Sequence, residues 1–138
     1  MTPAYTRALA ALFLALPAHA EPGPTAPAYT YAAEVQRVVD GDTIDVTIDV
    51  GFRIHLANER IRILCVDAPE TRTRDLAEKA AGIIAKSWLR ERLSRADVVI
   101  VQTVEDDAFG RWLAHVYADG VSVAEEMLAL GFAERRPC

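Results

Sequence analysis

The stretch AEVQRVVDGDTIDVTIDV, residues 33–50, determines the fold class of this chain. Two runs rich in β-branched residues, 33–40 and 43–50, flank Gly41 and Asp42, and the second run alternates strictly between polar and apolar residues. This pattern is typical of two antiparallel strands joined by a tight turn, because successive side chains of a strand point to opposite faces. We therefore predict that the folded domain begins with a β-hairpin.

Three further runs downstream of the hairpin also predict strands: ERIRILCV (59–66), VVIVQTV (98–104) and RWLAHVYA (111–118). The intervening residues 51–58 could extend the second strand or form an excursion from it. A short helix is predicted over 124–130, because Ser122 and Glu125 stand at capping-box spacing and Gly131 can end the helix.

A long helix is predicted between the third and fourth strands, over residues 74–93, with Asp75 at its N-terminal end. This prediction rests on apolar residues that recur near helical spacing: Leu76, Ala80, Ile83, Ile84, Trp88 and Leu89. The fold class is therefore α+β and mainly β. We expect a five-stranded barrel of the oligonucleotide-binding (OB) type, with one long helix after strand 3 and a short C-terminal helix.

The N-terminal residues 1–20 predict a secretory signal peptide. Arg7 precedes the apolar run ALAALFLAL, and small residues stand at Ala18 and Ala20 before the expected cleavage site. A membrane anchor would require about 20 apolar residues, which this run does not reach. We expect export to the periplasm or the exterior, with no membrane attachment after cleavage. Residues 21–32 are proline-rich and predict a flexible lead-in, so the folded domain is expected over 33–138.

The composition is acidic, with 20 Asp and Glu against 15 Lys and Arg and a formal net charge of −5. Such a chain binds polyanions weakly by general charge attraction, so any nucleic-acid affinity must come from a localised site. The two cysteines, Cys65 and Cys138, could form a disulfide in an oxidising compartment. A buried thiol and a free terminal thiol are the alternative, and the sequence does not decide between them.

Acidic residues gather at two strand ends. Asp40 and Asp42 follow the first strand in VVDGDTI, whereas Asp67 and Glu70 follow the third in CVDAPE. Carboxylate oxygens from separate strands are the ligands that a hard cation such as calcium prefers. The sequence therefore predicts a cation site at one end of the barrel.

Two arginines occupy comparable positions beside apolar runs, Arg62 in RIRIL and Arg111 in FGRWLA. Guanidinium groups are planar bidentate donors suited to a phosphate, so carboxylates, cation and arginines together predict phosphoryl chemistry. In an ideal strand Arg62 and Asp67 point to opposite faces. If both serve one site, the strand must bend or bulge between them.

The segments VVDGDTI, RIRILCVDAPE and FGRWLAHVYADG, in this order and with a helix between the second and third, resemble the staphylococcal (thermo)nuclease-like family. The resemblance covers about residues 33–133. It implies a five-stranded OB-type barrel and a calcium-dependent phosphodiesterase that cuts DNA and RNA, leaving 3′-phosphates. We expect a monomer whose partner is the DNA or RNA substrate.

Carried over residue by residue, the resemblance implies that Asp42 and Asp67 bind Ca²⁺ together with the backbone carbonyl of Ala68. It also implies that Glu70 is the general base, or orients the attacking water.

The same resemblance assigns the scissile phosphate to Arg62 and Arg111. Phe109 stands where many members have tyrosine, and it implies a weaker contact with the nucleotide. The alternatives are a non-catalytic OB-fold module that binds nucleic acid or protein, and a calcium-stabilised structural domain. Binding modules usually lack parts of this constellation, whereas this chain has all of it.

Overall fold

The computed structural model describes residues 23–138, so the predicted signal peptide lies outside the described residues. Five long strands form the main sheet: β1 (Thr30–Asp40), β2 (Thr43–Asp49), β3 (His55–Ile63), β5 (Val99–Asp106) and β6 (Trp112–Ala118). Three strands of two residues and two helices complete the chain: β4 (Val66–Asp67), α1 (Leu76–Ser94), β7 (Val121–Ser122), α2 (Val123–Leu130) and β8 (Glu134–Arg135). No helix of the described part is long and apolar enough to span a membrane.

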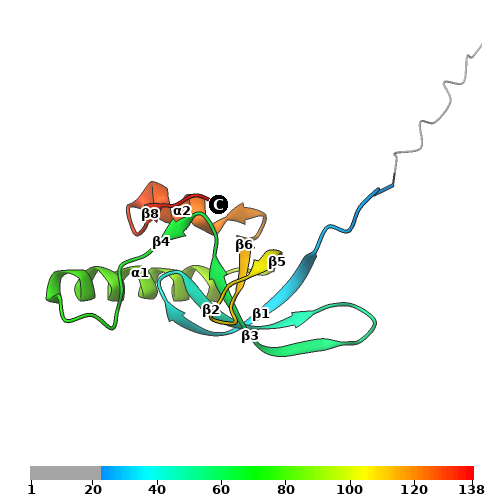
Figure 1. The fold of residues 1–138 in the computed structure, drawn as a ribbon, viewed down its shortest axis with the longest axis horizontal. Helices are drawn as coiled ribbons and strands as arrows, with labels where there is room; N and C mark the ends of the chain where they lie inside the picture. Colours follow the sequence, from blue (N-terminus) through cyan, green and yellow to red (C-terminus); the bar gives the residue numbers. More distant parts are fainter. Residues whose placement is uncertain (1–22) are drawn as a thin grey trace, which may run out of the picture.

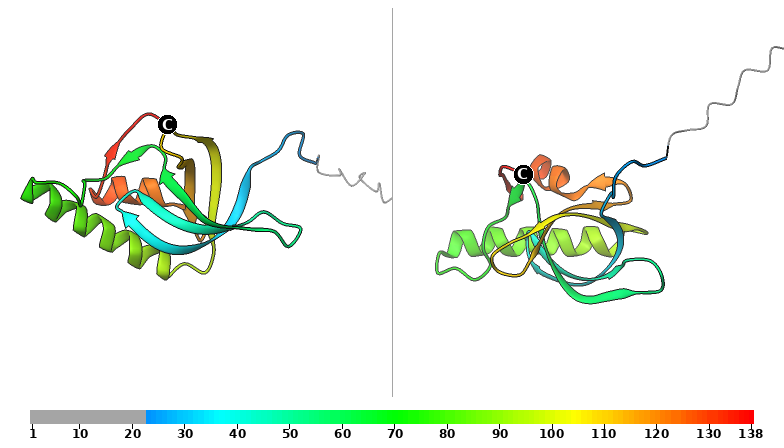
Figure 2. Two further views of the ribbon diagram at one scale, coloured as in Figure 1. Left: turned by 60° about the horizontal axis from the view of Figure 1, so that its bottom comes forward. Right: turned by 45° about the vertical axis from the view of Figure 1, so that its right-hand side comes forward.

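The long strands close into a barrel. They pair antiparallel in the order β3-β2-β1-β5-β6, and a parallel pairing between β3 and β6 joins the two ends. Helix α1 lies along one side of this barrel, and α2 lies near the short strand β8 (Figures 1 and 2). The predicted architecture, a five-stranded barrel with a long helix after the third strand and a short C-terminal helix, is confirmed.

The alternation seen in the first hairpin fills the barrel interior. Ile44, Val46 and Ile48 of β2 are buried, while the residues between them pair with β1 and β3 nearer the surface. Strand β1 begins at Thr30, three residues before the predicted start, because Thr30 to Ala32 pair with β5. In segment 51–58, which the sequence left undecided, residues before His55 form a loop and the rest belong to β3. The hairpin formed by β2 and β3 projects from the barrel at the right of Figure 1.

Helix α1 forms as predicted, but the apolar residues that indicated it do not form one buried face. Leu76, Ile83 and Ile84 are exposed, and the buried residues of the helix are Gly82, Ala85, Leu89 and Leu93. The reason is close backbone approach: a Cβ placed on Gly41 would lie 3.0 Å from the Cβ of Ala85. The N-terminal half of the helix therefore packs through the small residues Gly82 and Ala85, and the C-terminal half packs through Leu89 and Leu93.

The predicted capping residues are found at the start of α1 and at both ends of α2. Asp75 is the N-cap of α1 and accepts hydrogen bonds from the backbone N–H groups of Ala77 and Glu78. Ser122 caps α2 by accepting from the N–H of Glu125, and Gly131 ends α2 with a φ of 76°. The left-handed conformation at Gly131 favours glycine, because other residues pay a steric cost there.

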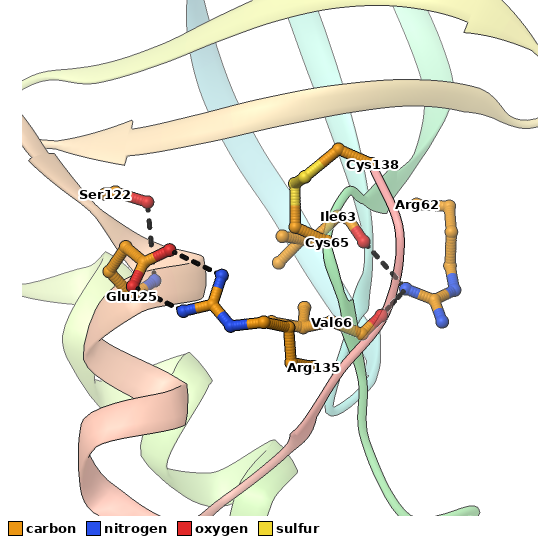
Figure 3. Close-up of a disulfide and its surroundings, with 8 residues drawn as sticks. All are labelled: Arg62, Ile63, Cys65, Val66, Ser122, Glu125, Arg135 and Cys138. Carbon is orange, nitrogen blue, oxygen red and sulfur yellow. Dashed lines mark hydrogen bonds and ion pairs between the residues drawn. A yellow bond between two sulfur atoms is a disulfide. The ribbon is translucent and has the colours of Figure 1, made fainter.

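A disulfide joins Cys65 to Cys138, with their Cα atoms 4.4 Å apart (Figure 3). Next to it β8 pairs antiparallel with β4, and the backbone N–H of Arg136 donates to the carbonyl of Cys65 over 2.8 Å. The alternative of two free thiols, which the sequence left open, is therefore excluded. These contacts attach the C-terminal residues to Cys65 and β4.

Removing this disulfide should lower the free energy of unfolding by about 2 to 4 kcal/mol, because the bridge closes a long loop in the unfolded chain. The two cysteines are separated by 73 positions, which places the loop toward the upper end of that effect. Urea unfolding of the Cys65→Ser/Cys138→Ser variant against the oxidised wild type measures the loss. A loss below about 1 kcal/mol would show that the bridge does not constrain the unfolded chain.

Candidate functional site

A cleft of about 380 Å³ opens at the end of the barrel where the β1–β2 turn meets the β3–β4 segment. Four carboxylates line it: Asp40, Asp42, Asp67 and Glu70. Four arginines line it as well: Arg60, Arg62, Arg111 and Arg136. Every charged residue that the sequence predicted for catalysis or metal binding through its side chain therefore lies in one cleft.

The third strand is broken between Arg62 and Asp67, as the alternation argument required. Strand β3 ends at Ile63, β4 begins at Val66, and Cys65 between them has a φ of 69°, in the left-handed region. The break turns the chain so that Arg62 Nη2 lies 2.9 Å from Asp67 Oδ1. The cost of this conformation is offset by the disulfide at Cys65 and the contacts of Arg62.

Arg62 holds this turn together. Its Nη1 donates to the carbonyl oxygens of Ile63 and Val66 over 2.7 and 2.8 Å, as Figure 3 shows. Its Nη2 also lies 3.1 Å from Asp42 Oδ2, and only 15% of the side chain is exposed. Arg62 thus neutralises two predicted calcium ligands, and it has a structural role besides its predicted one.

Asp42 is buried beside the tight turn between β1 and β2. Its Oδ2 accepts from the backbone N–H of Ala68 over 2.8 Å, and its Oδ1 accepts from Thr43 Oγ1 over 3.0 Å. The turn passes so close to Ala68 that a Cβ on Gly41 would lie 2.7 Å from the Ala68 Cβ. The contact of Ala68 in this structure is made by its amide, and the role of its carbonyl stays a prediction.

Glu70 stands at the mouth of the cleft and is positioned by α1. A Cβ on Gly82 of α1 would lie 2.6 Å from the carbonyl oxygen of Pro69, so only glycine lets the helix approach the Pro69–Glu70 backbone. Although Glu70 is exposed on its outer side, its pKa is raised above the ordinary value by partial loss of hydration. The charge of the neighbouring Asp40, and then the charges of Asp42 and Asp67, raise the pKa further.

The guanidinium of Arg111 forms an ion pair with Asp107. The Nε of Arg111 donates to Asp107 Oδ2 over 2.7 Å, and Asp107 Oδ1 accepts from the backbone N–H groups of Phe109 and Arg111. Partial burial raises the pKa of Asp107, but these hydrogen bonds outweigh it and hold the pKa below the ordinary value. Asp107 therefore stays ionised and fixes the guanidinium at the edge of the cleft.

Phe109, the predicted nucleotide contact, does not line the cleft. It is 83% exposed, and its ring centroid lies 5.4 Å from the guanidinium carbon of Arg111. The ring therefore covers one face of Arg111 by a cation–π contact. Its contact with substrate stays a prediction.

The donor set in the cleft fits a hard cation. Asp40 Oδ1 is buried and has no hydrogen-bond partner in the described part of the chain, and the neighbouring acidic groups repel it. Within residues 23–138, no group of three or more His, Cys, Asp or Glu side chains is arranged to hold a metal alone. Calcium accepts backbone carbonyls and waters beside carboxylates, so the predicted combination of Asp42, Asp67 and the Ala68 carbonyl remains suited to it.

Sequence reasoning missed two arginines of the cleft. Arg60 is bidentate to Asp45, with distances of 2.7 and 3.0 Å, and its position two residues before Arg62 on the same strand face could have revealed it. Arg136 reaches Asp67 Oδ2 over 2.5 Å. Only the cysteine pairing could have placed Arg136 here, because nothing in its local sequence marks a site.

Replacing Glu70 with glutamine should stabilise the metal-free protein at about pH 7, because it removes a charge that three neighbouring carboxylates oppose. A carboxyl whose pKa is raised on folding contributes stability below its unfolded pKa and loses it as the pH rises through the folded pKa. The gain should therefore shrink below the ordinary value of 4.5. Urea unfolding of both proteins in chelator at about pH 7 and about pH 4 checks this. A Glu70→Gln variant less stable than the wild type at neutral pH would contradict it.

Comparison with known proteins assigns the sequence of this chain to a family. Residues 60–136 match the model of the family described as staphylococcal nuclease homologue. This region contains all the predicted site residues except Asp42: Arg62, Asp67, Ala68, Glu70, Phe109 and Arg111.

Several curated proteins are similar to the chain. The SPbeta prophage-derived endonuclease YokF of Bacillus subtilis is 34% identical over 101 residues, covering 72% of this chain and 32% of the relative. The thermonuclease of Staphylococcus intermedius is 33% identical over 100 residues, covering 69% and 56%. The micrococcal nuclease of Shigella flexneri is 34% identical over 88 residues, covering 64% and 43%. The chain spans about a third to just over half of these relatives. It belongs to the family of staphylococcal nuclease homologues.

Proposed function

We propose that this protein is an exported, calcium-dependent nuclease that hydrolyses phosphodiester bonds of DNA, RNA or both. The observation that carries the proposal is the convergence of Asp42, Asp67, Glu70, Arg62 and Arg111 in one cleft of a family that includes proteins named endonuclease and thermonuclease. Carboxylates and guanidiniums in one hydrated cleft suit a reaction in which negative charge grows on a phosphate.

The division of labour in the cleft follows from the positions of these side chains. Glu70 takes or directs the proton of the attacking water, and its raised pKa brings its basicity closer to that needed near neutral pH. Arg62 and Arg111 stabilise the charge that grows on the phosphoryl oxygens. The bond to the 5′ oxygen then breaks, and the 3′-phosphate stays on the upstream product.

Arg111 is better prepared for this task than Arg62 in the metal-free structure. It is 30% exposed and its carboxylate partner, Asp107, lies outside the predicted metal site. Arg62 instead contacts both Asp42 and Asp67. We infer that Arg62 shares its donors between these carboxylates and the phosphate.

Calcium, when bound by Asp42, Asp67 and the Ala68 carbonyl, would supply a positive charge that attracts the phosphate and a water molecule. The observation in favour of this cation is the buried Asp40 Oδ1, which lines the same cleft as Asp42 and Asp67 and has no hydrogen-bond donor in the described residues. The protein supplies the oxygen ligands, and Glu70 and Arg111 act on the water and the phosphate.

The disulfide supports the proposed export. Disulfides persist in the periplasm and outside the cell, and are rare in reducing compartments. The Cys65–Cys138 bridge beside the cleft therefore agrees with the signal peptide predicted over residues 1–20.

The substrate and the product ends can be determined in one experiment. Oxidised protein is incubated with end-labelled single-stranded DNA or RNA of the same sequence, in calcium or in chelator, and the fragments are treated with a 3′-phosphatase before electrophoresis. We expect calcium-dependent fragments whose mobility changes on phosphatase treatment. Binding of both nucleic acids without any cleavage would instead support the non-catalytic module.

A further inference from the structure

The last residues of the chain enter the cleft beside a predicted calcium ligand. Arg136 Nη2 lies 2.5 Å from Asp67 Oδ2, while Arg62 occupies the other oxygen, Oδ1. The backbone of Arg136 is fixed as well, because its N–H donates to the carbonyl of Cys65. The tail therefore adds the guanidinium of Arg136 to those of Arg60, Arg62 and Arg111 in the cleft.

Arg136 has more free surface than the other arginines of the cleft. Its side chain is 63% exposed, against 42% for Arg60, 30% for Arg111 and 15% for Arg62. Within residues 23–138 its only side-chain partner is Asp67, through Nη2, so Nε and Nη1 remain available. A guanidinium with two free donors facing an open cleft can bind a phosphate without first giving up its carboxylate.

The position of Arg136 depends on the disulfide. Cys138 lies two residues beyond it and is bonded to Cys65, the residue at the break between β3 and β4. The backbone contacts of this segment are few: the N–H of Arg136 donates to the carbonyl of Cys65, and β8 pairs with β4 through Val66–Arg135 and Asp67–Glu134. A segment with so few contacts opens locally at low cost in free energy, so we expect the covalent bond to be the main restraint on Arg136 over Asp67.

We propose that Arg136 is a substrate-positioning residue that binds a backbone phosphate of the nucleic acid, and that the Cys65–Cys138 disulfide holds it in place. This proposal rests on the proposed nuclease function. The chain is acidic overall, with a formal net charge of −5. One guanidinium in the cleft therefore contributes a large part of the electrostatic attraction to a polyanion. Reduction of the disulfide then weakens substrate binding.

The test measures binding without cleavage. Fluorescence anisotropy of a labelled single-stranded oligothymidylate is followed in chelator for the wild type and for Arg136→Ala and Arg135→Ala. We expect Arg136→Ala to raise Kd by about three- to tenfold, as for one partly solvated charged contact, and to lower the salt dependence of binding by about 0.7 in log–log slope. Arg135→Ala is the matched control, because Arg135 pairs with Glu125 of α2 (Figure 3). It should bind like the wild type.

A redox arm tests the dependence on the disulfide. Reduction should raise the Kd of the wild type by the same factor as Arg136→Ala, and it should leave the Kd of Arg136→Ala unchanged. Equal effects of reduction on both proteins would overturn the role of the bridge. An oxidised Arg136→Ala variant with wild-type Kd and salt slope would overturn the proposal whether or not the reduced protein stays folded.

Cleavage of the same oligonucleotide by the wild type in calcium separates this proposal from the proposed function. If the wild type cleaves and Arg136→Ala binds normally, only the role of Arg136 fails. If the wild type binds and does not cleave, the nuclease function fails, and the binding data still decide the role of Arg136. A wild type that neither binds the oligonucleotide in chelator nor cleaves it in calcium overturns both.

Discussion

Replacing Arg111 with alanine is expected to lower kcat for phosphodiester cleavage by about 100- to 1,000-fold, as for the loss of one donor to a developing negative charge. The fold should survive, because within the described residues the hydrogen bonds, ion pairs and cation–π contacts of the Arg111 side chain involve only Asp107 and the ring of Phe109. Single-turnover cleavage of a labelled oligonucleotide in saturating calcium measures the chemical step. Far-ultraviolet circular dichroism checks the fold.

Arg95→Ala is a matched control for this variant. Arg95 pairs with Glu91 four residues earlier on α1, which repeats the spacing of Arg111 and Asp107 away from the cleft. It should retain wild-type kcat. Retention of wild-type kcat by Arg111→Ala would remove Arg111 from the proposed chemistry, and equal losses in both variants would indicate a general effect of losing a surface ion pair.

The Glu70→Gln variant is expected to lose about 100- to 10,000-fold in kcat, since glutamine keeps the shape of the side chain and cannot accept a proton from water. The neutral-pH stability gain described above should accompany this loss. A variant that is better folded and far slower would locate the defect in chemistry and not in structure. Kinetics over a pH series and urea unfolding of the same preparation give both quantities.

Glu91→Gln on the exposed face of α1 controls for the loss of an acidic residue. It should change neither kcat nor the pH dependence of stability beyond the small effect of an exposed ion pair. Wild-type turnover by Glu70→Gln in calcium would show that Glu70 neither takes nor directs a proton.

The barrel could be predicted from sequence because its strands carry their own signals. Residues 43–50 alternate strictly between polar and apolar, and the apolar Ile44, Val46 and Ile48 are buried in the structure. The capping residues Asp75 and Ser122 mark where the two helices start. These features are local, and each rests on a period or a turn that the sequence displays directly.

The packing face of α1 could not be predicted in the same way. The apolar residues at helical spacing include Leu76, Ile83 and Ile84, which are exposed, whereas the buried residues of the helix are Gly82, Ala85, Leu89 and Leu93. What decides the face is how closely two backbones approach, and that depends on residues far apart in the chain, such as Gly41 and Ala85.

The site was predictable where residues stand at strand ends, and unpredictable where long-range contacts build it. In a regular strand Arg62 and Asp67 would point to opposite faces, so a shared site required a break between them. The structure places this break at Leu64 and Cys65. Arg136 gave no local signal, because a disulfide between residues 73 positions apart brings it to Asp67. The exposure of Phe109 outside the cleft likewise depends on how its loop folds around Asp107.

One measurement tests the central claim most directly: the time course of cleavage of a labelled single-stranded DNA by the oxidised wild type, with Arg111→Ala from the same purification alongside. Calcium is present at the start, chelator is added midway, and excess calcium is then restored. We predict that wild-type cleavage stops on chelation and resumes on calcium addition, and that the variant shows about 100-fold less product throughout. Cleavage that continues in chelator, or that is equal in the variant, would contradict a calcium-dependent nuclease site in this cleft.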